Sequence, residues 1–527
     1  MPKTASWKNG TNCCSWDGVT CHMSKDYVIG LDLSSWLQGA LHSNSTLFLL
    51  RNLQRLNLAD MSRISPTSLT NLSSTLTSLR LDGCRLQGTF PINIFHLPNL
   101  CILSLFDNSN LMGALPQTNW SSSPLVRLSL SFTKFQGPIP DSVGNFTSLE
   151  YLHLDGSKFT GSVPPTLWNL DRLSSLRLGG INLSGTVDFD MLARLKYLED
   201  LYLWGNLNLM LPNNGNRSFP RLKELILSGV NLTEFPYFLS SLEELEWLNL
   251  YGNKISGPIP EWFGRMWSKT MIILDLSSNN FTGEIPSSIC QLRNDLRTIR
   301  LSQNRLEGTL PRSLVNCKNL EVLDLSENKL EDRFPYWLDT LPNLQVLDLR
   351  SNKLRGLINS FGKNNHPFPK LHIFDLSDNK FYGHLPAKYI ANFIAMKDKA
   401  RSASQYMWVN HSQATYQDSV MVVMKGFTIE LQLPPSTSSG DGEEKAQFGH
   451  WIEWWVVAMG YGCGISFGIS TGYIMLETRR PKWLVRKVER WLMRMVERKR
   501  RKKKTRSKKN AAQRNHARYL SMTDFAH

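Results

Sequence analysis

The chain has 527 residues, enough for two to four ordinary domains, and a formal net charge of +16. This charge is concentrated in the tail: the 51 residues from Glu477 hold 19 Lys or Arg against 4 Asp or Glu, and the other 476 residues hold 41 basic and 40 acidic groups. A neutral body with a basic tail argues against nucleic-acid binding and favours a membrane boundary.

Residues 1–27 precede the first regular pattern and hold three closely spaced cysteines, Cys13, Cys14 and Cys21. Residues 1–11 have no apolar core long enough for a secretory signal. Because a stack of repeats needs a cover over its first apolar end, we predict that this segment is a partial N-terminal cap.

Residues 28–386 repeat the frame L-x-x-L-x-L-x-x-N-x-L-x-G-x-I-P, most fully at 245–260, with spacings of 23 to 27 residues. This frame and period denote leucine-rich repeats. Each L-x-L predicts a short strand, and the fifteen copies predict an α/β-type solenoid, a right-handed superhelix with a concave parallel sheet. The first leucine-type residues of L-x-L are Leu31, Leu56, Leu79, Leu103, Leu128, Leu152, Leu176, Leu201, Leu225, Leu248, Leu274, Ile299, Leu323, Leu347 and Phe374.

The Asn of the frame predicts a ladder, because its side-chain amide can satisfy buried backbone groups of adjacent turns. Cys84 occupies the same place, and we interpret it as a ladder residue rather than a reactive thiol or metal ligand. Cys290 and Cys317 fall in repeat turns and are interpreted as semi-buried packing residues. The predicted ladder asparagines are Asn108, Asn206, Asn253, Asn279, Asn304, Asn328, Asn352 and Asn379.

Several copies keep an L-D-L-S strand, which indicates scaffold, but the copies between 128 and 250 depart from it at solvent-facing positions. Aromatic residues and Arg dominate binding energy at interfaces, where one anchor contributes ~2 kcal/mol or more. We therefore predict a ligand-binding patch on the concave surface, with ordinary surface variation as the alternative for any one residue. The patch comprises His153, Arg177, Tyr202, Trp204 and Tyr251.

Ten N-x-S/T sequons all lie upstream of residue 451. Together with the cysteine pattern, this one-sided distribution favours a lumenal or extracellular side. The predicted glycosylation sites are Asn9, Asn44, Asn71, Asn119, Asn145, Asn182, Asn216, Asn231, Asn280 and Asn410.

After Pro386 the period breaks. Residues 387–433 lack the frame but contain aromatics and the alternating segment SVMVVMKGFTIEL. Residues 434–450 are rich in Pro, Ser, Gly and acids, which predicts a flexible juxtamembrane linker. Without further repeats, the solenoid is expected to leave an apolar end open after Phe374.

Residues 451–476 predict one transmembrane helix. The uncharged span 454–476 would be about 34 Å long as a helix, enough to cross a hydrocarbon core of ~30 Å. Tryptophans flank its start and basic residues follow its end, which places the repeats outside and the tail in the cytosol.

Four glycines in this span recur every fourth residue and therefore share one helix face, which predicts a GxxxG-type packing groove for a partner helix. They are Gly460, Gly464, Gly468 and Gly472. The alternative is that glycine is simply common in membrane spans.

The tail, residues 477–527, is far too short for a kinase domain and has no kinase signature. Its apolar residues at helical spacing between basic ones predict contact with lipids of the inner leaflet, with a nuclear signal as the alternative. We find no catalytic constellation, no metal-ligand spacing and no cofactor motif, so an enzyme is not predicted.

The cap motif W-x5-C-C-S-W-D-G-V-T-C, the I-S-G-P-I-P turns, the island with Tyr389, Asn392-Phe393 and Lys425-Gly426, and the Gly-rich span together resemble plant receptor-like proteins of the fungal-resistance class. The resemblance implies a Cys14–Cys21 disulfide. It also indicates a shortened member, because the family cap has four cysteines and about four more repeats follow its island.

The resemblance further implies a single-pass plasma-membrane receptor in plant defence. It would bind an extracellular pathogen- or peptide-derived ligand, pair with a leucine-rich-repeat receptor kinase through the glycine face, and recruit a co-receptor kinase. Two alternatives remain: a non-signalling decoy or degenerate paralogue, and a binding protein of the polygalacturonase-inhibitor type.

Overall fold

A computed structural model gives the fold. The structure describes residues 6–25, 27–34, 45, 47, 50–60, 64–211, 219–266, 270–291, 295–358, 367–383, 393 and 395, and the backbone of four strands between 408 and 431. The chain forms two compact units, residues 1–438 and 439–527, and the second lies outside the described residues.

Among the residues that the structure describes, no helix has the length and apolar character to cross a bilayer. The predicted span at 451–476, its glycines Gly460, Gly464, Gly468 and Gly472, and the basic tail all lie outside those residues.

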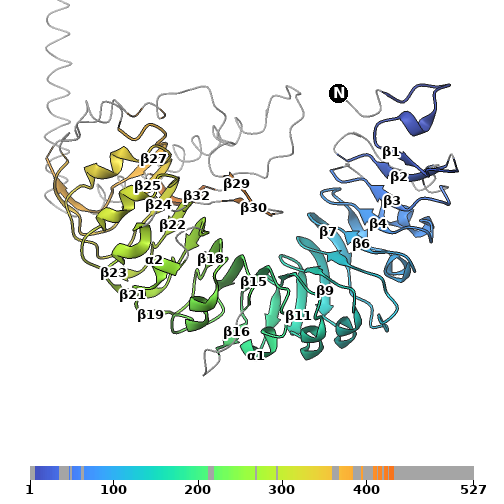
Figure 1. Ribbon diagram of the computed structural model, residues 1–527, viewed down its shortest axis with the longest axis horizontal. Helices are drawn as coiled ribbons and strands as arrows, with labels where there is room; N and C mark the ends of the chain where they lie inside the picture. The colour runs from blue at the N-terminus through green and yellow to red at the C-terminus, as the bar shows by residue number, and fades with distance from the viewer. Residues whose placement is uncertain are drawn as a thin grey trace, which may run out of the picture. The chain divides into compact units, whose positions relative to one another are not determined.

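The main element of the first unit is a 16-stranded sheet, whose strands follow one another along the inner side of an arc (Figure 1). β1 (Val19–Cys21) pairs antiparallel with β2 (Val28–Asp32), and the later strands are parallel. They are β3 (Arg55–Asn57), β4 (Ser78–Arg80), β6 (Ile102–Ser104), β8 (Arg127–Ser129), β10 (Tyr151–His153), β12 (Ser175–Arg177), β15 (Asp200–Trp204), β17 (Glu224–Ser228), β18 (Trp247–Asn249), β20 (Ile273–Asp275), β22 (Thr298–Arg300), β24 (Val322–Asp324), β25 (Val346–Asp348) and β27 (Ile373–Asp375).

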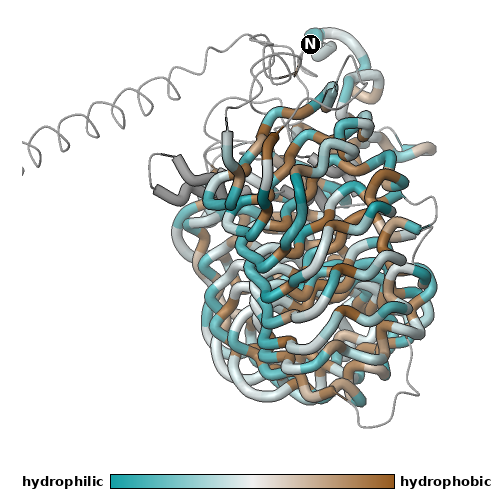
Figure 2. Tube along the Cα trace, turned by 90° about the vertical axis from the view of Figure 1, so that its left-hand side faces the viewer, coloured by the Kyte–Doolittle hydropathy of each residue, from teal (hydrophilic) through white to brown (hydrophobic). Residues whose placement is uncertain are grey.

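The register of this sheet confirms the predicted strand of every repeat. Each first leucine of L-x-L pairs with the one in the next copy, as Leu152 does with Leu128 and Leu176. These side chains are buried in one continuous core, except Phe374, which is partly buried and packs against it. Figure 2 shows the resulting recurrence of hydrophobic stretches in neighbouring coils.

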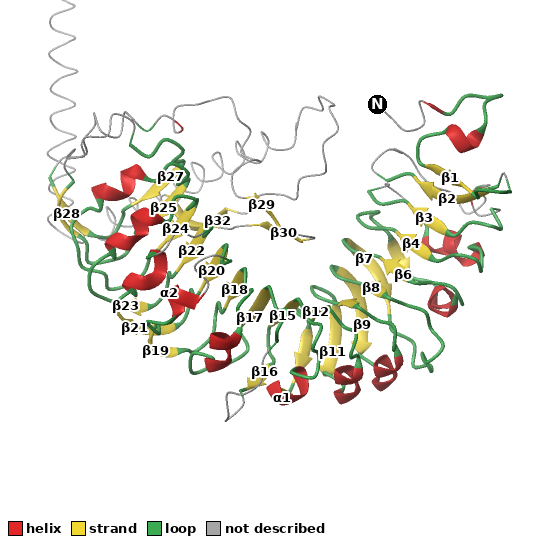
Figure 3. Cartoon of the chain, in the orientation of Figure 1, coloured by secondary structure: helices red, strands yellow, loops and turns green. Residues whose placement is uncertain are grey.

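The second half of each repeat turns the chain along the outer side, where the helices lie (Figure 3). Many of these short helices start directly after the proline at the last position of the frame, which stands at the N-cap in an extended conformation, as Pro91, Pro140 and Pro236 do. The helices are η2 (Cys13–Ser15), η4 (Pro66–Asn71), η5 (Ile92–His96), η6 (Asp141–Asn145), η7 (Pro165–Asn169), α1 (Phe189–Leu192), η8 (Tyr237–Ser241), α2 (Phe263–Met266), η9 (Ser287–Cys290), η10 (Arg312–Asn316) and η11 (Tyr336–Thr340).

Smaller parallel sheets follow the ladder positions of the repeats, and two hairpins form within residues 387–433. The alternating segment predicted there forms the hairpin of β31 and β32. These strands are β5 (Gln87–Thr89), β7 (Asn108–Gly113), β9 (Thr133–Pro138), β11 (Lys158–Ser162), β13 (Asn182–Ser184), β14 (Thr186–Asp188), β16 (Asn208–Met210), β19 (Ser256–Pro258), β21 (Asn280–Gly283), β23 (Arg305–Leu306), β26 (Arg355–Leu357), β28 (Lys380–Tyr382), β29 (Trp408–His411), β30 (Ala414–Gln417), β31 (Val420–Met424) and β32 (Phe427–Leu431).

From the second copy on, a residue with positive φ recurs four positions after the first leucine of L-x-L. Its φ is 54° at Asp107, 54° at Phe132 and 65° at Gly156, although only glycine adopts this conformation without cost. The amide N–H of this residue donates to a carbonyl of the next coil, as from Phe132 to Asp155 at 2.9 Å and from Gly156 to Gly179 at 2.8 Å. These bonds tie the coils together at the carboxyl ends of the strands.

The predicted asparagine ladder is confirmed at all but one position. Asn304 is typical: its Nδ2 donates to the carbonyls of Leu276 at 3.0 Å and Leu301 at 3.1 Å, and its Oδ1 accepts from the N–H of Phe281 at 3.0 Å. Cys84 takes the same role, with its Sγ 2.9 Å from the carbonyl oxygen of Leu58.

Asn206 was the wrong ladder prediction. Its side chain is exposed, and the neighbouring Leu207 enters the core instead. The coil changes course here because β15 continues to Trp204, two residues longer than most strands of the sheet.

The cysteines bear out one prediction and correct another. Cys14 and Cys21 form the predicted disulfide in the cap, and Cys13 is free. Cys290 and Cys317 are more than packing residues, because they are bonded to each other across two adjacent turns. Both are fully buried, so the bond staples two coils inside the core.

Within the described residues, the apolar end that we predicted to stay open after Phe374 is partly covered. Phe393, which is fully buried, packs edge-on against Phe368 and Phe374 with ring centroids 5.4 and 5.5 Å apart. This aromatic cluster extends the core beyond the last strand of the sheet.

Candidate ligand-binding site

Parallel pairing brings three of the five predicted binding residues into one row on the concave sheet. His153 of β10 pairs with Arg177 of β12, which pairs with Tyr202 of β15. Neighbours in such a row lie about 4.8 Å apart, so their side chains touch. Trp204 ends the same strand as Tyr202, and Tyr251 follows β18, two strands further along.

A polar network links this row to residues that the sequence analysis missed. The Nε2 atom of His153 lies 2.6 Å from Oγ of Ser175, and that hydroxyl donates to a carboxylate oxygen of Asp200. The guanidinium of Arg177 contacts the same oxygen at 3.4 Å. Because the serine stands between histidine and aspartate, this is not the order of a hydrolase triad, in which the imidazole bridges the other two groups.

Burial sets the charges of this network. Burial raises the pKa of Asp200, although Arg177 and the hydrogen bond from Ser175 oppose the rise. Burial, followed by the nearby cations Arg177 and Arg127, holds the pKa of His153 well below its usual range. The imidazole is therefore neutral at physiological pH, and the Arg177–Asp200 pair is the main charged element of the row.

Tyr202 is held inside the sheet surface rather than presented to solvent. Its hydroxyl donates to Glu224, and the Arg177 guanidinium carbon lies 4.2 Å from the ring centroid. The ring also packs edge-on against Trp247 at 5.7 Å. Burial raises the pKa of Tyr202, so the phenol stays protonated.

The solvent-facing assignment is thus wrong for Tyr202, and His153 and Arg177 are only partly exposed. The physical reason is crowding on the same face: Tyr202, Ile226, Trp247 and Ile273 form a small apolar cluster separate from the main core. Trp204 and Tyr251 are exposed, at 37% and 48%, and remain available as direct anchors.

The missed residues share one signal. Ser175, Asp200, Glu224 and Trp247 each stand directly before the first leucine of L-x-L, and strand alternation places that position on the concave face too. The residue between the two leucines marks only the first row of the concave face, and the residue before them marks the second.

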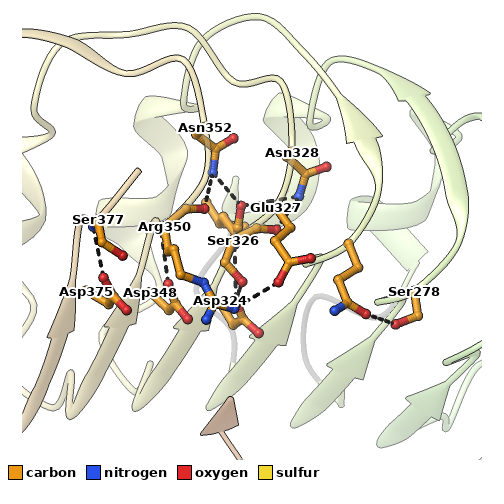
Figure 4. Close-up of polar contacts among 12 residues, drawn as sticks. Ser278, Asp324, Ser326, Glu327, Asn328, Asp348, Arg350, Asn352, Asp375 and Ser377 are labelled. Atoms are coloured by element: carbon orange, nitrogen blue, oxygen red, sulfur yellow. Dashed lines mark hydrogen bonds and ion pairs between the residues drawn. The ribbon is translucent and has the colours of Figure 1, made fainter. Parts of the chain in front are cut away.

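The copies with L-D-L-S strands have a different chemistry, as Figure 4 shows. Asp324, Asp348 and Asp375 pair in register, and each uses one carboxylate oxygen to accept a backbone N–H two residues later, at 2.9 to 3.0 Å. Each of these aspartates therefore satisfies a backbone N–H of its own coil, which supports the scaffold interpretation. Burial and then Asp324 raise the pKa of Asp348 to about 7.

Six predicted glycosylation sites are exposed, and none of these lies on the concave sheet: Asn9, Asn71, Asn119, Asn145, Asn182 and Asn231. Asn280 is half-buried in β21. Asn44 and Asn216, and the side chain of Asn410, lie outside the described residues.

Models of known families match several parts of the chain. A leucine rich repeat model matches residues 294–354, and another matches 75–97, 148–170, 244–266 and 270–292. A leucine rich repeat N-terminal domain matches residues 1–22, where the cap was predicted.

The relatives that this chain resembles include plant receptor-like proteins. Receptor-like protein 35 of Arabidopsis thaliana is 29% identical over 47% of this chain and 34% of its own length, and Receptor-like protein 18 of the same plant is 31% identical over 40% and 30%. The chain therefore spans about a third of the length of these relatives.

Among solved structures, the ectodomain of the Arabidopsis thaliana receptor kinase GASSHO1/SCHENGEN3, in complex with CASPARIAN STRIP INTEGRITY FACTOR 2, is 27% identical, with a TM-score of 0.53 over 74% of this chain and 49% of that one. The strand register, the asparagine ladder and these similarities all indicate leucine-rich repeats. The chain is a leucine-rich-repeat protein that is similar to plant receptor-like proteins.

Proposed function

We propose that this chain is a cell-surface receptor that recognises an extracellular peptide or protein on the central concave face and signals through a receptor kinase in plant defence. The observation that carries the proposal is the replacement of scaffold residues by a contiguous patch: the fixed row of His153, Arg177 and Tyr202, flanked by the exposed rings of Trp204 and Tyr251.

Rigid anchors favour binding, because a side chain that is already held loses little freedom when a ligand arrives. Arg177 is held by Asp200 and by the buried ring of Tyr202, which Glu224 and Trp247 hold in turn. The similar ectodomain that was solved with a bound factor supports a binding role for this architecture. The chain acts by binding, without catalysis of its own.

Signal transmission is proposed to use parts beyond the described residues. The four glycines of the predicted span would contact a receptor kinase, a co-receptor kinase would join on ligand binding, and the basic tail would contact anionic lipids. This places the chain in the plasma membrane with its repeats outside.

The binding face is tested by expressing the full chain behind a secretory signal in leaf cells. We expect Trp204→Ala with Tyr251→Ala to reduce the oxidative burst to fungal culture filtrate about ten-fold or more, with unchanged surface level. Tyr237→Ala with Tyr336→Ala removes two exposed rings on the outer helices and serves as the control. A burst that survives in the first variant, or never occurs in the wild type, contradicts the proposal.

The membrane contact has a matched control within the same helix. Gly464→Leu with Gly468→Leu should lower co-precipitation of the receptor kinase, because the larger side chains fill the groove. Gly462→Leu lies on the opposite face and should leave recovery unchanged. Equal recovery from all variants would exclude the glycine face as the contact.

A further inference from the structure

Three exposed aromatic side chains lie at the carboxyl ends of the concave strands, beside the proposed binding face. Phe106 and Phe132 are each 45% exposed, and their rings meet edge-on at 5.7 Å. Trp204 is exposed further along, at the end of β15. Large exposed rings that gather in one place mark interaction surfaces more often than scattered ones do.

Glycines in the coils between these rings make the surface continuous. The Phe132 ring covers Gly156, where an added Cβ would lie 2.7 Å from the ring. The Trp204 indole lies over Gly179 and Gly180, where an added Cβ would lie 1.5 and 2.2 Å from indole atoms. Gly156 and Gly179 are themselves bonded, N–H to carbonyl, at 2.8 Å. We call Phe106, Phe132 and Trp204, with the glycines under them, the aromatic band.

The band offers a ligand ring faces but few free hydrogen-bonding groups. The backbone N–H groups of Phe132, Gly156 and Gly180 are all donated to the next coil, at 2.8 to 2.9 Å. Ser131 donates to Asp155 at 2.5 Å. A sugar, whose hydroxyls need partners, or a strand adding to an edge would find little to bond with here.

The ligand chemistry that suits such a surface is an extended proline-rich segment. A polyproline II helix has a solvated backbone without internal hydrogen bonds, and its flat rings pack on aromatic faces. From Phe106 to Trp204 the band crosses four coil steps, or about 19 Å at 4.8 Å per step. About six residues in polyproline II conformation cover that length, at 3.1 Å per residue.

Charge at one end of the band adds a second element of specificity. Asp107 is exposed next to Phe106, and burial together with the nearby Asp60 raises the pKa of Asp107 despite Arg85. A cation on the ligand would relieve this unfavourable environment.

We propose that the aromatic band binds a proline-rich peptide segment that carries a basic residue at the end nearest Asp107. The inference deepens the proposed function and rests on it only for the assumption that a ligand reaches this face. The inference concerns only the class of ligand. The kinase contact and the role of Tyr251 are tested by separate experiments.

The test uses the full-length chain in detergent and a synthetic peptide of eight prolines with one lysine at each end. We expect saturable binding by calorimetry. Trp204→Ala and the pair Phe106→Ala with Phe132→Ala should each weaken it about ten-fold or more. Asp107→Asn should weaken it less and should reduce its dependence on salt.

Gly179→Ala is the most informative variant. It removes no side chain, but its added methyl group displaces the Trp204 indole from its position over the glycine. The φ of Gly179 is not positive, so alanine fits its backbone. We expect a several-fold loss of binding in the wild-type background and no further loss in Trp204→Ala. Such non-additivity shows that the glycine acts through the ring.

Tyr336→Ala, on the outer side and similarly exposed, should change binding less than two-fold, and all variants should keep the melting temperature of the wild type within about 2 °C. Equal affinity for a glycine-serine peptide with the same lysines, tighter binding of cellohexaose, or undiminished binding by the Trp204→Ala and Gly179→Ala proteins would each overturn the inference. If the peptide test fails while Trp204→Ala with Tyr251→Ala reduces the burst as expected, only the ligand class is wrong.

Discussion

Single residues in this solenoid have effects that reach into the neighbouring coils. The side chain of Asn304 bonds the preceding coil at Leu276 and Phe281, and Gly179 lies under the indole of Trp204 from the next strand of the sheet. A substitution is therefore best judged by what it does one coil away.

Replacing a ladder asparagine should be costly. Asn304→Ala removes the acceptor of the Phe281 N–H and the donor to three carbonyls, and all of these groups are buried. We expect a loss of about 3 kcal/mol in unfolding free energy, measured by urea denaturation, because unpaired buried polar groups cost about 1–3 kcal/mol each. Asn206→Ala, at the exposed position, should change stability by less than about 0.5 kcal/mol. Equal effects of the two variants would refute the ladder role.

Asp348 should make the fold more stable at mildly acidic than at alkaline pH. Its folded pKa of about 7 lies above the unfolded value near 3.9, so the folded state binds more protons between these values and loses stability as pH rises through 7. From pH 6.5 to 8 we expect a loss of about 1 kcal/mol by urea denaturation. Asp348→Asn keeps the acceptor for Arg350 and should flatten this slope; an unchanged slope would contradict the assignment.

At the scale of elements, the sequence predicted the repeated strands, but it did not predict features that depend on contacts between neighbouring strands. All fifteen strands were found, because leucines at fixed spacing must point into one core. The left-handed position was not visible, since Asp, Phe and Gly all occupy it. Tyr202 was assigned to solvent because its burial depends on Trp247, two strands away. Contacts across the sheet require the register, which the chain order alone does not display.

The disulfide between Cys290 and Cys317 joins two neighbouring coils, and its two cysteines are 27 residues apart in the sequence. Closing a loop of this length stabilises by about 3.5 kcal/mol in the chain-entropy account. Reduction should therefore lower the melting temperature of the wild type more than that of Cys290→Ala with Cys317→Ala. Cys101→Ala, which removes a free thiol, should behave like the wild type. A wild type whose melting is insensitive to reductant would argue against this bond.

For the whole molecule, carbohydrate and ligand are expected to occupy different surfaces. Protein secreted from plant cells should carry glycans at exposed sequons such as Asn71, Asn145 and Asn182, and fewer at the half-buried Asn280. Site-by-site mass spectrometry before and after enzymatic deglycosylation measures this directly. Deglycosylation should leave peptide binding to the aromatic band unchanged; a loss would place a glycan on the binding face.

The asparagine ladder has a gap, and that gap coincides with the binding region. Between Asn108 and Asn253 the ladder positions hold residues such as Thr133, Ser157 and Val230, which cannot bond two coils at once. Amide protons there should exchange with deuterium sooner than those beside Asn279 or Asn304. The central coils would then be the most deformable part of the solenoid, and a bound ligand would change the curvature at its own binding site.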